Sequence, residues 1–336
     1  MFVLRIPVFL GLCLIAGLTG PAALPAWSAE DRASISFLVE NDSFGTTDRH
    51  YTNGLKASWL SKKSQFTGLS RWLAETLPIF PNGGARRIGF AVGQNMYTPE
   101  DLSATALLTD DRPYAGWLYA ELGMTAQTDN RLDSVAISLG VIGPASQADD
   151  LHEFWHDTFG FTRARGWDNQ LENEPALNIT YQHSRRYYRE NTAAFGLDAD
   201  LMPHLGFSLG NVFTYGAAGL TMRLGNDFKG DFGGPPRIRP SMPGSSHFEP
   251  PAGNFGWYLF AGIEGRAVAR NIFLDGNTFT SSHSVDKKTF VGDAQVGIAL
   301  IFPRFRLTYT QVISTNEFEG QDHPHNFGAL SLTANF

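Results

Sequence analysis

Short segments in which apolar and polar residues alternate recur along this chain, and they restrict its fold more than any other feature. In VGDAQVGIALIF, Ala294, Val296 and Ile298 fall on one face of an extended strand, and Asp293 and Gln295 fall on the other. A period of two residues is typical of strands with one apolar and one polar face. In a soluble sandwich the apolar face would contact a core, whereas in an outer-membrane barrel it would contact lipid.

We count about twelve such segments, an even number of the kind that bacterial outer-membrane barrels contain. They span 33–41, 50–61, 87–96, 117–128, 131–142, 176–187, 192–204, 209–224, 255–270, 288–302, 303–314 and 327–336. Aromatic residues near the segment ends indicate interfacial girdles, namely Trp59, Trp117, Tyr119, Trp257 and Tyr258. We therefore predict an all-β fold, a transmembrane antiparallel β-barrel of about 12 strands with a short helix in an outer loop. A periplasmic sandwich is the alternative.

The first residues are typical of a secretory signal peptide. Arg5 precedes an apolar run from Ile6 to Leu18, which is too short for a membrane-spanning helix, and a cleavage site lies near 26–29. We expect residues 1–28 to be the signal and residues 29–336 to form a single barrel domain in the cell outer membrane. The chain ends on an aromatic residue, Phe336, in an alternating segment, which resembles the signal that the barrel-assembly machinery reads.

The amino-acid composition excludes some kinds of reaction and partner. Cys13 is the only cysteine and would leave with the signal, so the exported protein would have neither disulfides nor a thiol nucleophile. The formal net charge of −7 argues against a nucleic-acid partner. The Pro/Gly-rich stretch 225–254 is expected to be a loop, and 61–86 to hold a short helix from Trp72 to Leu77.

Polar residues that could take part in a reaction lie mainly in a few connections between strands. These connections are outside the cell if the first strand starts in the periplasm. Asn41 and Asp42 end the first predicted strand, and Thr52 begins the second. Strand parity predicts that Asp42 and Thr52 point into the barrel near its outer rim. An Asx turn would explain an Asn-Asp pair at a strand end.

A third outer connection contains H-E-x-x-H, formed by His152, Glu153 and His156 on a predicted helix. This spacing can bind zinc, and Glu172 or Glu174 could supply a third ligand. Alternatively, one of the two histidines takes part in different chemistry, and an ordinary imidazole pKa near 6.5 suits proton abstraction from water. The histidines could also be loop residues without chemistry.

Several motifs together resemble the outer-membrane lipid A deacylases, the family that removes the 3′-linked acyl chain. They cover most of the mature chain and read ENDSFGTTDRHYTNGL, GQNMYTP, DDRPYAGWLY, VIGPAS, the His156 helix, GWDNQLENEP, LGND and FAGIEGR. The resemblance implies a twelve-stranded barrel with a calcium-dependent site near its outer rim, where a histidine activates water and the cation stabilises the oxyanion. It also implies lipid A or lipopolysaccharide as the substrate.

The resemblance carries roles to particular positions. It makes His156 the base and Asp42 the calcium ligand, and it places Asn41 and Thr52 in the catalytic site. His152 stands where the family usually has glutamine. Two positions depart from the family. Ala104 and Thr105 replace a Lys-Arg pair, and Thr162 replaces a glutamate, which leaves the exact lipid substrate open.

Arg112 is a candidate to replace part of the missing Lys-Arg pair, because a guanidinium can bind a lipid phosphate bidentately. A purely structural ion pair in the barrel is the alternative for this arginine. The sequence thus predicts a calcium-dependent ester hydrolase of lipid A. A non-catalytic barrel, acting as a pore or a surface-interaction protein, is the second possibility, and a zinc hydrolase is the third.

Overall fold

The computed structural model describes residues 32–45, 50–63, 68, 71, 84–161, 163–190, 196–234, 237–238, 240 and 244–336. The signal expected at 1–28, the helix expected from Trp72 to Leu77 and the departure at Thr162 lie outside these residues. None of the helices in the described ranges is long and apolar enough to cross a membrane.

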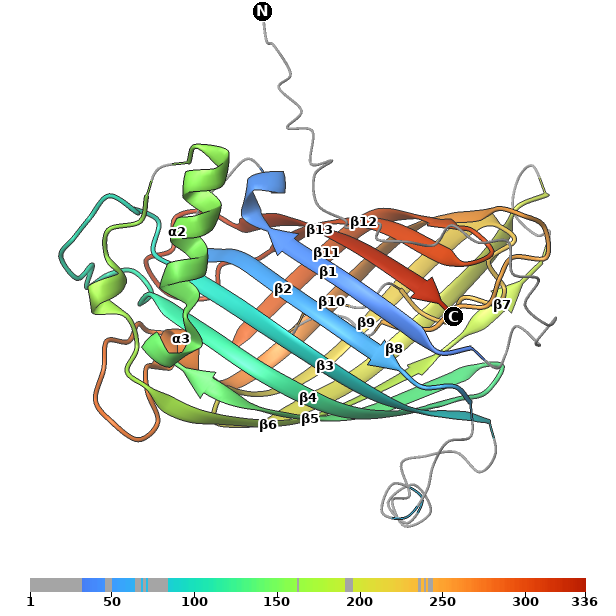
Figure 1. Cartoon of the computed structure of the whole chain (residues 1–336), viewed down its shortest axis with the longest axis horizontal. Helices are drawn as coiled ribbons and strands as arrows, with labels where there is room; N and C mark the ends of the chain where they lie inside the picture. Colours follow the sequence, from blue (N-terminus) through green and yellow to red (C-terminus); the bar gives the residue numbers. More distant parts are fainter. Residues whose placement is uncertain are drawn as a thin grey trace, which may run out of the picture.

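The described residues form thirteen strands, and twelve of them close into an antiparallel barrel (Figure 1). The strands are β1 (Ser34–Asn41), β2 (His50–Leu60), β3 (Ala85–Thr98), β4 (Ala115–Gln127), β5 (Arg131–Ile142), β6 (Glu174–Arg185), β7 (Tyr187–Arg189), β8 (Asp198–Gly210), β9 (Phe213–Asn226), β10 (Gly256–Asn271), β11 (Phe290–Ile301), β12 (Phe305–Ser314) and β13 (His325–Asn335). Each barrel strand pairs with the next in sequence, except that β6 pairs with β8. β1 pairs with β13 over its whole length and closes the cylinder. β7 lies outside the ring and pairs only with β8.

Two predicted strands are displaced along the chain. The seventh and eighth segments were expected at 192–204 and 209–224, but β8 and β9 begin at Asp198 and Phe213. Alternation continues beyond the expected end of β8, with Leu205, Phe207 and Leu209 all exposed. The connection between the two strands is therefore a two-residue turn, Asn211 and Val212, rather than a loop at 205–208.

Burial in this barrel is inverted relative to a soluble protein. Large apolar side chains such as Phe37, which is 58% exposed, cover the outer wall, whereas polar side chains such as Glu264 and Arg266 are buried inside. This is the distribution expected when lipid contacts the outer wall. Not every aromatic near a strand end contributes to a girdle, however. Trp117, Tyr119 and Tyr258 are buried side chains of the interior, so their assignment to the girdles was wrong.

The Pro/Gly-rich stretch between β9 and β10 is a loop, as expected, and its described residues occupy the lumen. We call residues 227–255 the inner loop. Its Arg237 bonds Glu40 of β1 and Gln295 of β11, and its Asp231 bonds Arg306 of β12. Its Phe248 carbonyl accepts a hydrogen bond from Asn335 of β13. A segment that contacts inward side chains around the ring in this way must lie inside the cylinder.

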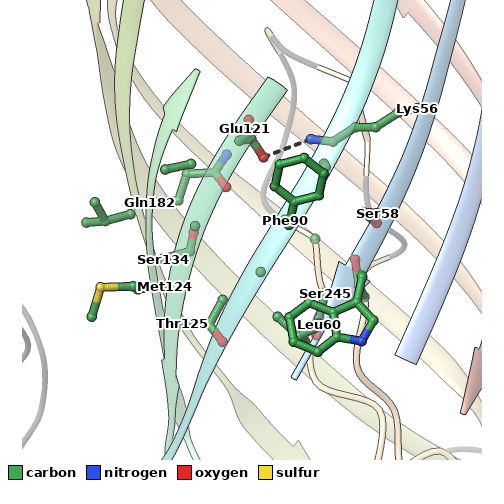
Figure 2. A pocket seen from close by; sticks show the side chains of 18 of the residues that line it. Lys56, Ser58, Leu60, Phe90, Glu121, Met124, Thr125, Ser134, Gln182 and Ser245 are labelled. Atoms are coloured by element: carbon green, nitrogen blue, oxygen red, sulfur yellow. Dashed lines mark hydrogen bonds and ion pairs between the residues drawn. The ribbon is translucent and has the colours of Figure 1, made fainter. Parts of the chain in front are cut away.

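A cavity of about 120 Å³ lies against strands β2 to β6. Figure 2 shows the Lys56–Glu121 ion pair, 3.0 Å long, at one side of this cavity, with Ser245 of the inner loop also lining it.

The filled lumen predicts that the protein does not conduct ions. In a planar lipid bilayer the intact protein should give no stable conductance steps, because the inner loop occupies the interior. Replacing residues 229–252 with a short Gly-Ser linker should produce such steps, since the wall itself is closed. Stable steps from the intact protein would contradict this arrangement of the loop.

Candidate functional site

The candidate site is built on the outside of the barrel wall, beneath α2 (Ala148–Phe159). The helix follows the short helix η3 (Pro144–Ser146) in the connection between β5 and β6. Asp149 and Asp150 in its first turn favour the positive end of the helix dipole. Gly160, at φ 73°, ends the helix and donates its N–H to the His156 carbonyl. Figure 1 shows α2 crossing the strand ends on the same side of the barrel as η2 (Asp42–Gly45).

One row of residues across four strands marks the place where the helix sits. Asn41, Asn53, Met96 and Gly116 lie opposite one another in the ladder from β1 to β4, so they share a face of the sheet. The neighbouring row, which includes Glu40 and Trp117, is buried in the lumen. The first row therefore faces outward. Yet Met96 is 0% exposed, which requires a cover on the outer side of the wall.

That cover is α2 and the turn before it. A Cβ atom added to Gly116 would lie 2.0 Å from Ser146 Oγ and 2.3 Å from Ala148 Cβ, so glycine allows the helix to rest directly on the wall. Gln94 Nε2, from β3, donates to the Ser146 carbonyl over 2.6 Å. These contacts fix the start of α2 against β3 and β4.

Thr52 also lies on this outer face, and its predicted inward direction was wrong. Its hydroxyl bonds that of Thr98 over 2.7 Å, and Thr98 is two residues beyond Met96 on β3, so it shares the outer face. The cause is a β-bulge between Tyr51 and Asn53, which shifts the alternation by one residue. Tyr51 points inward and bonds Glu40, so only the part of β2 after the bulge follows the expected parity.

Both histidines of the H-E-x-x-H motif face the wall. Ala148, His152 and His156 repeat at the four-residue spacing of one helix face, and His152 and His156 are 2% and 4% exposed. Their ring centroids are 4.0 Å apart. Burial, and secondarily the charge of His156, lowers the pKa of His152 to about 3. His152 is therefore neutral at physiological pH.

Glu153 of the same motif points the other way. Its carboxylate is exposed and lies 2.5 Å from Arg163 Nη1, and the same guanidinium binds Asp157. Glu174, a candidate third zinc ligand, instead accepts hydrogen bonds from Asn277 and the Thr278 backbone. The described part of the chain contains no cluster of three or more His, Cys, Asp or Glu that could hold a metal. The zinc interpretation of H-E-x-x-H is therefore not supported.

Asp42 opens η2 directly after Asn41 and is 1% exposed. Across the ladder from Asn41, the buried Asn53 Oδ1 has no hydrogen-bond partner among the described residues. A buried carboxylate and an unsatisfied amide oxygen are oxygen ligands of the kind that calcium takes. Asp42 and Asn53 are therefore the residues that would help to hold such an ion. Sequence reasoning missed Asn53, because a strand asparagine gives no sign in the sequence that its amide oxygen will be buried without a partner.

Arg112 belongs to a different place. It is 1% exposed, it pairs with Glu317 over 2.7 Å, and its guanidinium lies near the Tyr97 and Phe318 rings. Tyr97 lies within the buried aromatic interior, stacked on Phe273. Arg112 is thus on the lumen side of the wall and does not join the histidines. The ion pair with Glu317 favours the structural alternative for Arg112 over the predicted phosphate contact.

The inner loop supports the site from behind. Glu40, one residue before Asn41, accepts hydrogen bonds from Tyr51 Oη at 3.0 Å, from the Ile238 N–H at 3.2 Å and from Arg237 Nε. The Ile238 side chain also approaches Gly54 so closely that a Cβ there would lie 2.7 Å from its Cδ1. The strand ends that carry Asn41 and Thr52 are therefore held from the lumen side.

A closed twelve-stranded barrel with an apolar outer wall defines an outer-membrane β-barrel protein. The family model described as "Outer membrane protein LpxR" matches residues 8–336, and the chain belongs to this LpxR family. This confirms the resemblance based on the motifs, and it places the protein in the outer membrane.

The chain is also similar to solved structures, and the first of them has the same fold. The structure of LpxR from Salmonella typhimurium is 22% identical, with a TM-score of 0.72 over 90% of this chain and 100% of that chain. The β domain of the Bordetella autotransporter BrkA is 8% identical, with a TM-score of 0.46 over 91% of this chain and 100% of that chain. Among curated proteins, no sequence matches.

The contact at Gly116 predicts how α2 can be lifted from the wall. Gly116→Ala inserts a methyl group where there is no space, and overpacking of this kind costs about 1–3 kcal/mol. Protease cleavage within 143–173 should become about tenfold faster or more, while the heat-modifiable barrel remains. Gly265→Ala is the matched control, since a Cβ there meets nothing within 4 Å. Equal cleavage rates in the two variants would contradict the proposed packing of α2.

Proposed function

We propose that the protein is an outer-membrane ester hydrolase that removes a 3′-linked acyl chain from lipid A. The observation that carries the proposal is the position of two buried imidazoles between α2 and the outer face of the wall. Exposed apolar side chains of the same strands, such as Phe37 and Phe90, continue from this site along the wall. A lipid in the outer leaflet could thus present an ester to the imidazoles while its acyl chains contact the wall.

In the proposed reaction, His156 takes a proton from a water molecule as the water oxygen attacks the ester carbonyl carbon. The carbonyl oxygen becomes an oxyanion. The bond between the carbonyl carbon and the sugar oxygen then breaks, and the departing oxygen takes the proton from His156. The products are a free fatty acid and a lipid A hydroxyl group. Asn41 and Thr52, on the same face of the wall, would orient the water and the ester.

A calcium ion bound near Asp42 and Asn53 would add positive charge that stabilises the oxyanion. Both residues are fixed by the wall, Asn53 directly in the ladder and Asp42 through the neighbouring Asn41. Their positions would therefore require little rearrangement when an ion binds.

The pore alternative receives no support from a lumen that is filled by the inner loop. A surface-interaction protein without catalysis would leave the acyl pattern of lipid A unchanged. Mass spectrometry of lipid A from cells with and without the protein therefore tests the proposal directly. Loss of one ester-linked acyl chain is the expected result.

Substitution of the base is the sharpest test of the mechanism. His156→Ala should lower acyl release by about 10²- to 10⁴-fold, the usual contribution of a general base, and leave a heat-modifiable barrel. The control is His323→Ala, because His323 is an exposed residue of another loop at the same end of the barrel. Equal rates of acyl release in the two variants would show that His156 is not the general base.

The cation can be tested by selective chelation. A calcium-selective chelator should abolish acyl release and added calcium should restore it, whereas a zinc-selective chelator should have no effect. Asp42→Asn removes a charged ligand, so it should raise the calcium concentration needed for half-maximal release about tenfold or more. Full activity in the presence of the calcium chelator would show that the reaction does not require calcium.

A further inference from the structure

Trp167 is not part of the H-E-x-x-H motif, yet its indole donates a hydrogen bond to one of the two histidine rings. It lies in η4 (Trp167–Asn169), in the segment that leads from α2 to β6. Its Nε1 donates to His152 Nδ1 over 3.1 Å. Its ring also packs against Tyr114, with centroids 5.0 Å apart, so the indole is fixed on two sides.

This hydrogen bond determines where His152 carries its proton. An indole N–H can only donate, so Nδ1 must be the accepting, unprotonated nitrogen. A neutral imidazole carries one proton, and in His152 that proton must then be on Nε2. The residue is thus held in a single tautomer by a neighbour outside its own helix.

The protonated nitrogen has no partner. His152 Nε2 is buried and makes no hydrogen bond to any described residue. Buried donors are nearly always satisfied, so an exception calls for an explanation. The ring that carries this donor lies 4.0 Å from the ring of His156, centroid to centroid. A group that reacts beside His156 would therefore be within reach of the free N–H.

We propose that His152 donates a hydrogen bond from Nε2 to the carbonyl oxygen of the bound ester, and that Trp167 is the positioning residue that holds His152 in the donating tautomer. The inference rests on the proposed function, since it concerns the ester attacked beside His156. A glutamine side chain could also offer an N–H donor at this position, but only histidine needs a partner to select its tautomer.

The first test asks whether the N–H donor of His152 matters, or only the space that its ring fills. His152→Gln keeps an N–H donor and should retain kcat to within about threefold, whereas His152→Leu removes it and should lower kcat about 10²-fold with little change in KM. Activity is measured as fatty acid release from lipid A in mixed micelles. If His152→Leu is as active as the wild type, the donor role is overturned while the hydrolase proposal stands. If the wild type itself releases no fatty acid, the proposed function fails first, and this inference fails with it.

The second test addresses Trp167. Trp167→Phe keeps the ring but removes its N–H, and it should lower kcat about five- to tenfold, the factor that one ordinary hydrogen bond represents. In the His152→Gln background the same change should have less than about a twofold effect, since glutamine has no tautomer to select. Trp257→Phe, in strand β10, is the matched control. Equal losses in both backgrounds would mean that Trp167 acts only through packing.

The tautomer of His152 can be determined by NMR, independently of any enzymatic activity. In protein labelled with ¹⁵N-histidine, the nitrogen shifts of His152 should show a protonated Nε2 and an unprotonated Nδ1 at neutral pH. Trp167→Phe should move the Nδ1 shift, because its hydrogen bond is lost. A protonated Nδ1 in the wild type would overturn the assignment, whether or not the protein hydrolyses lipid A.

Discussion

The backbone hydrogen bonds of a closed ladder are the constraint on which the rest of this structure depends. In lipid, each backbone donor and acceptor must find its partner within the protein, and the pairing of β1 with β13 leaves no free edge in the ring. Closure also makes the wall a fixed platform. The row from Asn41 to Gly116 keeps its spacing because it is part of that ladder, and α2 can rest on it through a single glycine.

The strand pattern was predictable because lipid and lumen impose opposite polarity on alternate residues. Twelve strands were expected, and the barrel has twelve. The alternating pattern does not show where a β-bulge interrupts a strand and changes which residues face outward. The bulge between Tyr51 and Asn53 turned the Thr52 side chain from the predicted inward direction to the outer face of the wall. The aromatic residues show the same limit, since Trp117 and Trp59 look alike in sequence but lie on opposite faces.

Contacts between residues distant in the sequence account for what the sequence did not show. The pairing of Arg112 with Glu317 favours a structural role for this arginine over the predicted phosphate contact. His156 and His152 were found from spacing and from the family resemblance, and the structure brings them together. Trp167 and Asn53 carried no signal of their own. Their importance comes from hydrogen bonds that are made or missing in the folded chain, which no local pattern encodes.

The inner loop has a consequence for how the two ends of the chain are kept together. β1 and β13 are the first and last strands, so the chain has no covalent turn between them and their junction depends on the ladder alone. The loop bonds Glu40 on one side of that junction and Asn335 on the other. The inner loop therefore links β1 and β13 from inside and stabilises the junction at which a barrel of this kind would otherwise open. A segment that looks like a simple connection in the sequence thus helps to keep the barrel closed.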